Sequence, residues 1–225
     1  MGNRSIPEKD QFREIITDAM ELLSGRRPKG VQVEAQPPSR EAAVRKIADE
    51  VLTCMRCPLA SARKKAVPGY GVLDPLVMVI GEAPGAEEDR QGLPFVGAAG
   101  KYLDKWLAAL GLTRGADTFI GNIIKCRPPG NRDPYPEEQQ ACIPYLKEQI
   151  ACVRPKTILC VGRIASQILL DTETAMGRLR GTAYQFEGIP LVVTYHPSAV
   201  LRNPEYRRPV WDDLKLLQSL YAPGA

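Results

Sequence analysis

Four short, largely apolar runs, separated by segments with helical spacing, constrain the fold of this chain most. The runs lie at residues 76–80, 118–124, 157–161 and 189–195, and the helical patterns lie near 98–110, 136–151, 163–170 and 204–220. Strands that are apolar on both faces and alternate with helices are typical of parallel sheets covered by helices. The sequence therefore predicts an α/β fold with a mostly parallel sheet of four strands. The segment 184–188 predicts a short hairpin that leads into the last strand.

The N-terminal region differs in composition from the rest. Helical spacing over 8–24 is followed by a polar stretch with three prolines at 25–40, which predicts a linker. Ser39 begins a second helical pattern that runs to about Leu52. We expect residues 1–45 to form a helical extension with its linker and residues 46–225 to form one domain. Because the sequence has neither an apolar run of the ~18 residues needed to span a bilayer nor a secretory signal pattern, we expect a cytoplasmic monomer without a membrane partner.

Each predicted strand is followed by residues that suit a ligand site. Gly81 to Gly85 (GEAPG) follow the first strand, Asn122 and Cys126 lie at the end of the second, Gly162 and Arg163 follow the third, and His196 follows the fourth. In parallel sheets, ligands bind beyond the carboxyl ends of the strands. The sequence therefore predicts one site at that edge of the sheet.

Four of the six cysteines are spaced as a metal-ligand set. Cys54 and Cys57 form a C-x2-C pair, and Cys126 and Cys142 follow further along the chain. Four thiolates bind either zinc or an iron–sulfur cluster, and the single histidine excludes sites that need two. The alternative is that some are ordinary buried thiols, which fits Cys160 inside a predicted strand. Cys152 has no assigned role.

A glycine-rich segment connects the first strand to the next helix. GEAPG at 81–85 precedes three acidic residues at 87–89, and GLPFVG follows at 92–97. Glycines permit close backbone approach to a ligand, although a tight strand-to-helix turn has the same composition. The P-loop pattern is absent from this segment.

The order of these motifs resembles that of the family 4 uracil-DNA glycosylases over about residues 50–221. The series runs C-x2-C, GEAPG, GLPFVG, GN-x3-C, a further cysteine and HPSAVLR. The resemblance implies a three-layer α/β/α fold with a central, mostly parallel four-stranded sheet. It also implies uracil-containing DNA as substrate and a 4Fe-4S cluster held by Cys54, Cys57, Cys126 and Cys142. The implied reaction hydrolyses the N-glycosidic bond of a flipped deoxyuridine and leaves an abasic site.

The resemblance also assigns roles in a uracil pocket. Phe95 matches the stacking ring, Asn122 the amide that reads uracil, and His196 the group that stabilises the leaving base. Glu82 is the candidate general base or water-directing carboxylate. The expected substrate-binding set is Ala83, Gly85, Glu88, Phe95, Asn122 and His196, with Glu88 on the C5 side of the base. The alternatives are a core phenylalanine, a loop-capping asparagine, a structural histidine and, for residues 87–89, a solvated helix start.

The segment after His196 is expected to contact DNA. Val200 and Leu201 are candidate wedges that fill the gap left by the flipped base. Candidate phosphate contacts are Arg202, Arg207, Arg208, Lys125, Arg127 and Arg132, although scattered surface arginines are compatible with the net charge of +4.

Two departures from related families narrow the prediction. The loop CRPPGNRDPYP lacks the histidine with which some relatives trap the abasic site, and the glutamate of GEAPG separates the chain from family 5 enzymes. Two other classes of protein remain as alternatives at this stage. They are a non-catalytic nucleic-acid-binding module of the same fold and a zinc-stabilised nucleotide-binding protein.

Overall fold

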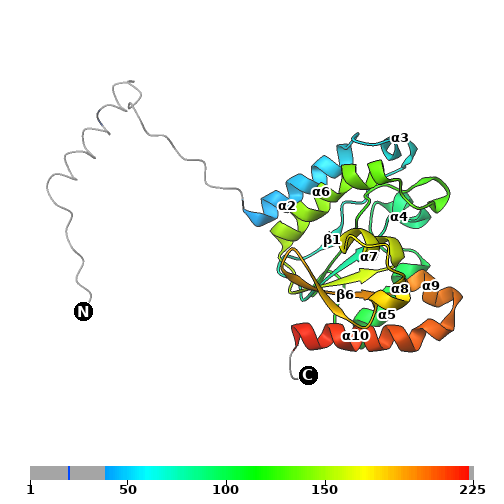
Figure 1. Cartoon of the computed structure of the whole chain (residues 1–225). Helices are drawn as coiled ribbons and strands as arrows, with labels where there is room; N and C mark the ends of the chain where they lie inside the picture. Colours follow the sequence, from blue (N-terminus) through cyan, green and yellow to red (C-terminus); the bar gives the residue numbers. More distant parts are fainter. Residues whose placement is uncertain (1–19, 21–38, 223–225) are drawn as a thin grey trace, which may run out of the picture. The chain divides into compact units, whose positions relative to one another are not determined.

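The computed structural model describes residues 39–222 together with Met20 (Figure 1). Its centre is one sheet of six strands in the order β1-β3-β2-β4-β6-β5. The strands are β1 (Tyr70–Gly71), β2 (Val77–Gly81), β3 (Thr118–Asn122), β4 (Thr157–Val161), β5 (Ala183–Phe186) and β6 (Ile189–Thr194).

The four inner strands β3, β2, β4 and β6 are parallel, as the sequence predicts. Val79 of β2 lies opposite Ile120 of β3 on one side and Leu159 of β4 on the other. The expected hairpin is present, because β5 pairs antiparallel with β6. The two-residue strand β1, which the sequence did not indicate, pairs antiparallel with β3 at the opposite edge. The sheet thus has six strands, of which the outer two are short and antiparallel.

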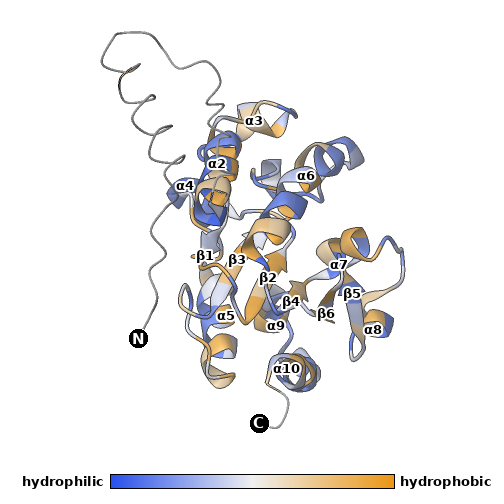
Figure 2. Ribbon diagram, turned by 90° about the vertical axis from the view of Figure 1, so that its left-hand side faces the viewer, coloured by the Kyte–Doolittle hydropathy of each residue, from blue (hydrophilic) through white to orange (hydrophobic). Residues whose placement is uncertain are grey.

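Helices cover both faces of the sheet, which confirms the three-layer architecture (Figures 1 and 2). The helices are α2 (Arg40–Thr53), α3 (Leu59–Ala62), α4 (Ala86–Gln91), α5 (Ala98–Ala109), α6 (Pro136–Val153), α7 (Arg163–Leu169), α8 (Met176–Leu179), α9 (Pro197–Arg202) and α10 (Arg207–Tyr221), with short 3-10 turns at Pro129–Asn131 and Pro204–Tyr206. Within the described ranges, no helix is both long and apolar enough to cross a bilayer.

Alternate strand residues build two separate cores. Met78 and Ile80 face a core formed with α2, α6, α7 and α8. Val77 and Val79 face a second core formed with α5, α9 and α10. Because side chains alternate along a strand, each inner strand must be apolar on both faces to serve both cores.

The helix expected from Ser39 is confirmed as α2. The Ser39 hydroxyl accepts a hydrogen bond from the backbone N–H of Ala42 at 3.2 Å, which caps the first turn. Helix α2 lies beside α6, and its Ile47 and Val51 are buried there. Helix α2 begins at Arg40, within residues 1–45 that were expected to form the extension. Its Val44 packs against the core of the domain. The helix expected over 8–24, apart from Met20, and the linker up to residue 38 lie outside the described residues.

Candidate active site

A cleft of about 640 Å³ opens at the carboxyl ends of the parallel strands. Nine of the residues given candidate roles from the sequence line it: Glu82, Ala83, Gly85, Glu88, Phe95, Asn122, Arg132, His196 and Arg202. They come from the segments that follow β2, β3 and β6, as the predicted topology requires. The structure therefore brings the expected site residues together in one cavity.

Asn122, the last residue of β3, supplies a buried amide to the cleft. Its side chain is 1% exposed, and its Oδ1 atom has no hydrogen-bond partner among the described residues. A buried polar atom without a partner costs about 1–3 kcal/mol. Gly81 makes room for it, because a methyl group at that position would lie 2.5 Å from Oδ1. An orphaned acceptor of this kind is suited to a ligand N–H.

Phe95 is held in a strained backbone conformation beside Asn122. Its φ of +51° lies in the left-handed region, which is uncommon for an aromatic residue. Arg114 donates to the carbonyl oxygens of Pro94 and Phe95 at 3.1 and 3.0 Å. The helix α5 approaches so closely at Gly100 that any side chain there would collide with the Phe95 backbone. These contacts fix the Phe95 backbone, and the ring lies in the cleft with its centroid 5.7 Å from that of the His196 ring.

His196 caps the N-terminus of α9 and is held in one tautomer. The Ser198 backbone N–H donates to Nδ1 at 3.2 Å, so the proton of a neutral imidazole resides on Nε2. Burial, with a further contribution from the charge of Arg202, lowers the pKa of His196 to about 4, against the opposing effect of Glu88. The ring is therefore neutral at physiological pH and has an N–H to donate.

Glu82 follows β2 and is half-buried in the cleft. Burial, reinforced by the charge of Asp133, raises the pKa of Glu82 to about 7, and Arg163 opposes this shift. Asp133 itself pairs with Arg163 at 2.7 Å, which ties the loop after Cys126 to the start of α7. A carboxyl with a pKa near neutrality is suited to general base work.

Glu88 has a structural task that the sequence did not reveal. Its carboxylate accepts hydrogen bonds from the backbone N–H groups of Gly85, Val96 and Gly97 at 3.1, 2.8 and 2.9 Å. It therefore joins the GEAPG loop to the loop that carries Phe95. The solvated helix start proposed as the alternative describes Glu87, which pairs with Arg90 at the surface, but not the buried Glu88.

Several cleft residues escaped the sequence analysis. The loop after Cys126 contributes Pro128, Asn131 and Asp133, and the end of β6 contributes Tyr195, which stacks on Tyr206 with ring centroids 4.0 Å apart. The polar, proline-rich composition of CRPPGNRD was a usable signal for the loop. No sequence signal indicated the tyrosine pair, because only the tertiary structure brings the 3-10 turn that carries Tyr206 beside the end of β6.

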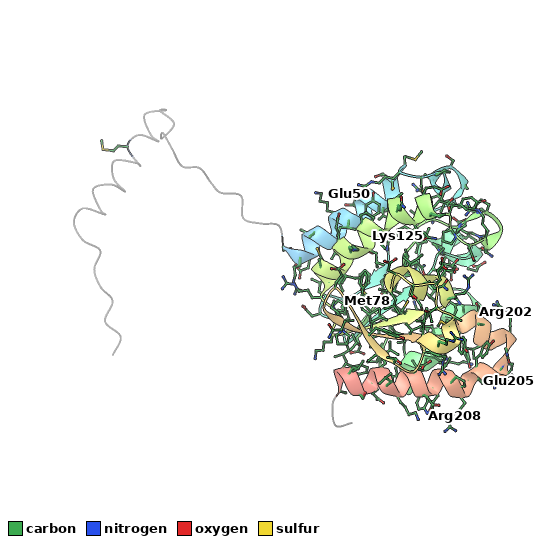
Figure 3. All side chains as sticks on the ribbon, viewed as in Figure 1. Glu50, Met78, Lys125, Arg202, Glu205 and Arg208 are labelled. Atoms are coloured by element: carbon green, nitrogen blue, oxygen red, sulfur yellow. The ribbon has the colours of Figure 1, made fainter. Side chains whose placement is uncertain are left out.

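The DNA-facing expectations need two corrections. Val200 is 1% exposed and packs in the core under α9, so it is unavailable as a wedge, whereas its neighbour Leu201 is 46% exposed. Lys125 is buried beneath α6 and has no access to a phosphate. Arg202 lines the cleft and extends outward at one end of the molecule (Figure 3).

The four expected cysteines lie together away from the cleft. Cys54, Cys57, Cys126 and Cys142 line one small cavity between α2, α3 and α6. Three N–H groups point at their sulfurs: Arg63 Nη1 reaches Cys126 at 3.1 Å, and the backbone N–H groups of Lys125 and Arg56 reach Cys142 and Cys54 at 3.3 and 3.5 Å.

The remaining thiols take no part in this cavity. Cys160 is buried within β4, as the alternative interpretation predicted. Across the described residues, no three His, Cys, Asp or Glu side chains converge tightly enough to hold a single metal ion. The cysteine cavity therefore offers four thiols with N–H support, and it is not a tight one-ion site.

Comparison with known proteins places the fold and the cleft in one class. The model of the uracil DNA glycosylase superfamily matches residues 68–215. A type-4 uracil-DNA glycosylase of Pyrobaculum aerophilum is 44% identical over 181 residues, which cover 77% of this chain and 92% of the relative. A type-4 enzyme of Archaeoglobus fulgidus is 42% identical over 182 residues, 77% and 91% of the two chains. A type-5 enzyme of P. aerophilum is 31% identical, over 69% of this chain and 82% of its own.

The chain therefore belongs to the uracil-DNA glycosylase superfamily. Within that superfamily, the higher identity to type-4 enzymes over most of both chains assigns it to the type-4 family. This confirms the family that the motif order indicated.

Proposed function

We propose that this uracil-DNA glycosylase excises uracil in the cleft built by Glu82, Phe95, Asn122 and His196. The observation that carries the proposal is the buried, unpartnered Oδ1 of Asn122. A flipped uracil supplies the missing partner, because its N3–H is a donor and its O4 accepts from the amide NH2. Cytosine presents the reverse pattern at both positions, so the same amide rejects it.

Recognition begins with extrusion of the nucleotide, which costs a few kcal/mol of stacking. The Phe95 ring then offers a face on which the base stacks, worth about 1–3 kcal/mol. Because Arg114 and Gly100 fix the Phe95 backbone, this surface is formed before the base arrives. Preorganisation of this kind lowers the entropy lost on binding.

Bond cleavage leaves negative charge on uracil, chiefly at O2. The neutral His196 ring donates from Nε2 to that oxygen, and such a donor in a dry site is worth about 2.7–4 kcal/mol. Glu82 then orients the attacking water and accepts its proton, or stabilises the cationic sugar while it is ionised. The Glu88 carboxylate keeps the two loops in register around the base through its three backbone N–H donors.

The cysteine cavity is proposed to hold a 4Fe-4S cluster. Four thiols with converging N–H groups match the donor set of such clusters, whose properties depend on hydrogen bonds to sulfur. No step of the hydrolysis requires an electron. We assign the cluster a structural role, joining α2, α3 and the segment that leads from β3 to α6.

The path of the DNA is proposed to cross α9. Leu201 is the exposed apolar residue there, and Arg202 lies beside it at the rim of the cleft. We also propose that the protein acts on DNA as a monomer.

Single-turnover excision from uracil-containing oligonucleotides tests the proposal. The variant is Asn122→Ala, and the control is Gln140→Ala, which removes an exposed amide from α6. We expect alkali-labile breaks with the wild type and the control, and at least about a hundredfold slower excision with Asn122→Ala, as for removal of a catalytic hydrogen-bond partner.

Other outcomes are equally informative. Equal rates for Asn122→Ala and the wild type would show that this cleft is not the uracil pocket. Binding of DNA without any breaks would support the non-catalytic module. Iron and sulfide analysis tests the cluster, since zinc in place of both would contradict it.

A further inference from the structure

Lys125 is the largest fully buried side chain among the described residues, and the proposed reaction gives it no role. It is 1% exposed and lies beneath α6 (Figure 3). Lysine is almost never fully buried unless its charge is compensated. Across the part of the chain that the structure describes, no carboxylate lies within ion-pair distance of its ammonium.

Two neutral oxygens take the place of a carboxylate. The Lys125 Nζ atom donates to the backbone carbonyl of Asn122 at 2.7 Å and to Oε1 of Gln149 at 2.6 Å. Gln149 is also buried, and its Nε2 donates to the carbonyl of Pro68 at 2.7 Å. The pair therefore joins the end of β3, the helix α6 and the segment before β1 through charge-assisted and amide hydrogen bonds.

The residue held in this way is the one that reads the base. The Asn122 side-chain oxygen has no hydrogen-bond partner within residues 39–222, so its position follows from the backbone that carries it. Lys125 donates a hydrogen bond directly to that backbone, at the carbonyl of Asn122. The backbone N–H groups of Ile123 and Ile124 donate to the carbonyls of Gly81 and Glu82, both at 2.9 Å, which joins the end of β2 and Glu82 to the same segment.

The main chain of Lys125 is tied to the cysteine region. Its N–H donates to Cys142 Sγ at 3.3 Å, and its carbonyl accepts from Val67 N–H at 2.8 Å. Cys142 and Gln149 lie seven residues apart on α6, two turns along the same face. One lysine thus contacts a cysteine through its main chain and the base-reading residue through its side chain.

We propose that Lys125 and Gln149 are positioning residues that set the placement of the Asn122 amide against uracil. The inference rests on the assignment of Asn122 in the proposed function. Its energetic basis is that a misplacement of about 1 Å at a reacting group can cost about a hundredfold in rate. It does not require the pair to touch the substrate.

A double-mutant cycle tests this role. Lys125→Met keeps the aliphatic stem and removes the three N–H donors. The control is Lys147→Met, at a residue that lies on the exposed face of α6 in a surface pair with Glu187. We expect Lys125→Met to slow single-turnover excision by about ten- to a hundredfold and to weaken binding of free uracil in parallel. Affinity for abasic DNA, iron content and the control variant stay at wild-type levels.

The decisive comparison is made in the Asn122→Ala background. A lysine that acts through Asn122 has nothing left to position there, so adding Lys125→Met leaves the residual rate unchanged. If Lys125 contributed only to general stability, Lys125→Met would lower the excision rate by the same factor with and without Asn122→Ala. That result would overturn the proposal. If Asn122→Ala alone matches the wild type, the fault lies in the proposed pocket and not in the positioning pair.

Gln149→Met applies the same cycle through the other partner if Lys125→Met does not fold. We expect a smaller loss of excision, again absent in the Asn122→Ala background. Lys125→Arg restores part of the rate if hydrogen bonding to the Asn122 carbonyl is what matters. Failure of both Lys125→Met and Gln149→Met to fold would assign the pair to stability and overturn the proposal.

Discussion

The backbone N–H of Ser198 lies 3.2 Å from Nδ1 of His196 and donates a hydrogen bond to it. This contact places the imidazole proton on Nε2, and burial lowers the pKa of the ring to about 4. His196 therefore does not titrate in the range where enzymes usually work. The pH dependence of excision is left to the Glu82 carboxyl, whose pKa is raised to about 7.

We predict that excision rises with pH through about 7 and then levels off. A raised carboxyl pKa means that Glu82 is ionised only above that value, and the base must be ionised to accept a proton. Below it, the single-turnover rate should fall about tenfold per pH unit, as the ionised fraction does. Saturating enzyme separates this effect from any pH dependence of DNA binding.

The Glu82→Gln variant provides the control for this profile. Its rate at high pH should fall by about 10²–10⁴-fold, the usual contribution of a general base, and should no longer rise through neutral pH. A wild-type rate that is already flat from pH 5 upward would show that Glu82 is not the titrating group.

Gly81→Ala should abolish most of the activity while leaving the fold intact. A methyl group there would lie 2.5 Å from Asn122 Oδ1 and 2.7 Å from the Phe95 ring, so one of the two must move. We expect excision to fall by about a hundredfold, as for a misplaced reacting group. Gly177→Ala on α8 is the matched control, because its methyl group would meet only the Tyr195 hydroxyl at 4.0 Å. Wild-type activity in Gly81→Ala would contradict the proposed geometry.

Substitutions at Leu201 and Val200 should have different effects, the first on insertion into DNA and the second on packing of the core. Leu201→Ala removes an exposed side chain and should slow excision from duplex DNA by about tenfold, a part of the few kcal/mol that unstacking costs, with little effect on single strands. Val200→Ala removes buried methyl groups and should lower the free energy of unfolding by about 1–3 kcal/mol, measured by chemical denaturation. An equal effect of Leu201→Ala on both substrates would exclude a wedge role.

The neighbouring residues Asp212 and Asp213 should differ sharply in stability measurements. Asp213 is buried and accepts hydrogen bonds from Arg180, Thr194 and the Gly181 backbone at 2.7–3.0 Å. Asp213→Ala leaves the Arg180 charge without its partner and should lower the free energy of unfolding by about 3–5 kcal/mol. Asp212→Ala removes a surface partner of Lys215 and should leave stability nearly unchanged. Similar urea concentrations at the midpoint of unfolding for both variants would contradict this prediction.

The sequence indicated much of this site because its signals are local. The apolar run that becomes β2 ends at Gly81, and the topology of a parallel sheet places Glu82, Asn122 and His196 at one edge before any coordinates are known. The cysteine spacing indicated a ligand set in the same way. These predictions depend on order along the chain, which the sequence contains.

Other features depend on which atoms meet across the fold. Glu88 looks like a surface acid at a helix start, yet it joins two loops, and Lys125 looks like a phosphate ligand, yet it is buried under α6. Val200 and Leu201 are equally apolar neighbours, and only the packing of α9 decides which of them is exposed.

By itself, the sequence determined the alternation of strands and helices, the edge of the sheet at which the candidate site residues gather and the set of four cysteines that lie together. The tertiary structure alone decided the burial of each polar group and the partner that compensates it. The physical reason is that burial and hydrogen bonding depend on contacts between segments far apart in the chain, such as Lys125 with Gln149. Periodicity within one segment carries no record of those contacts.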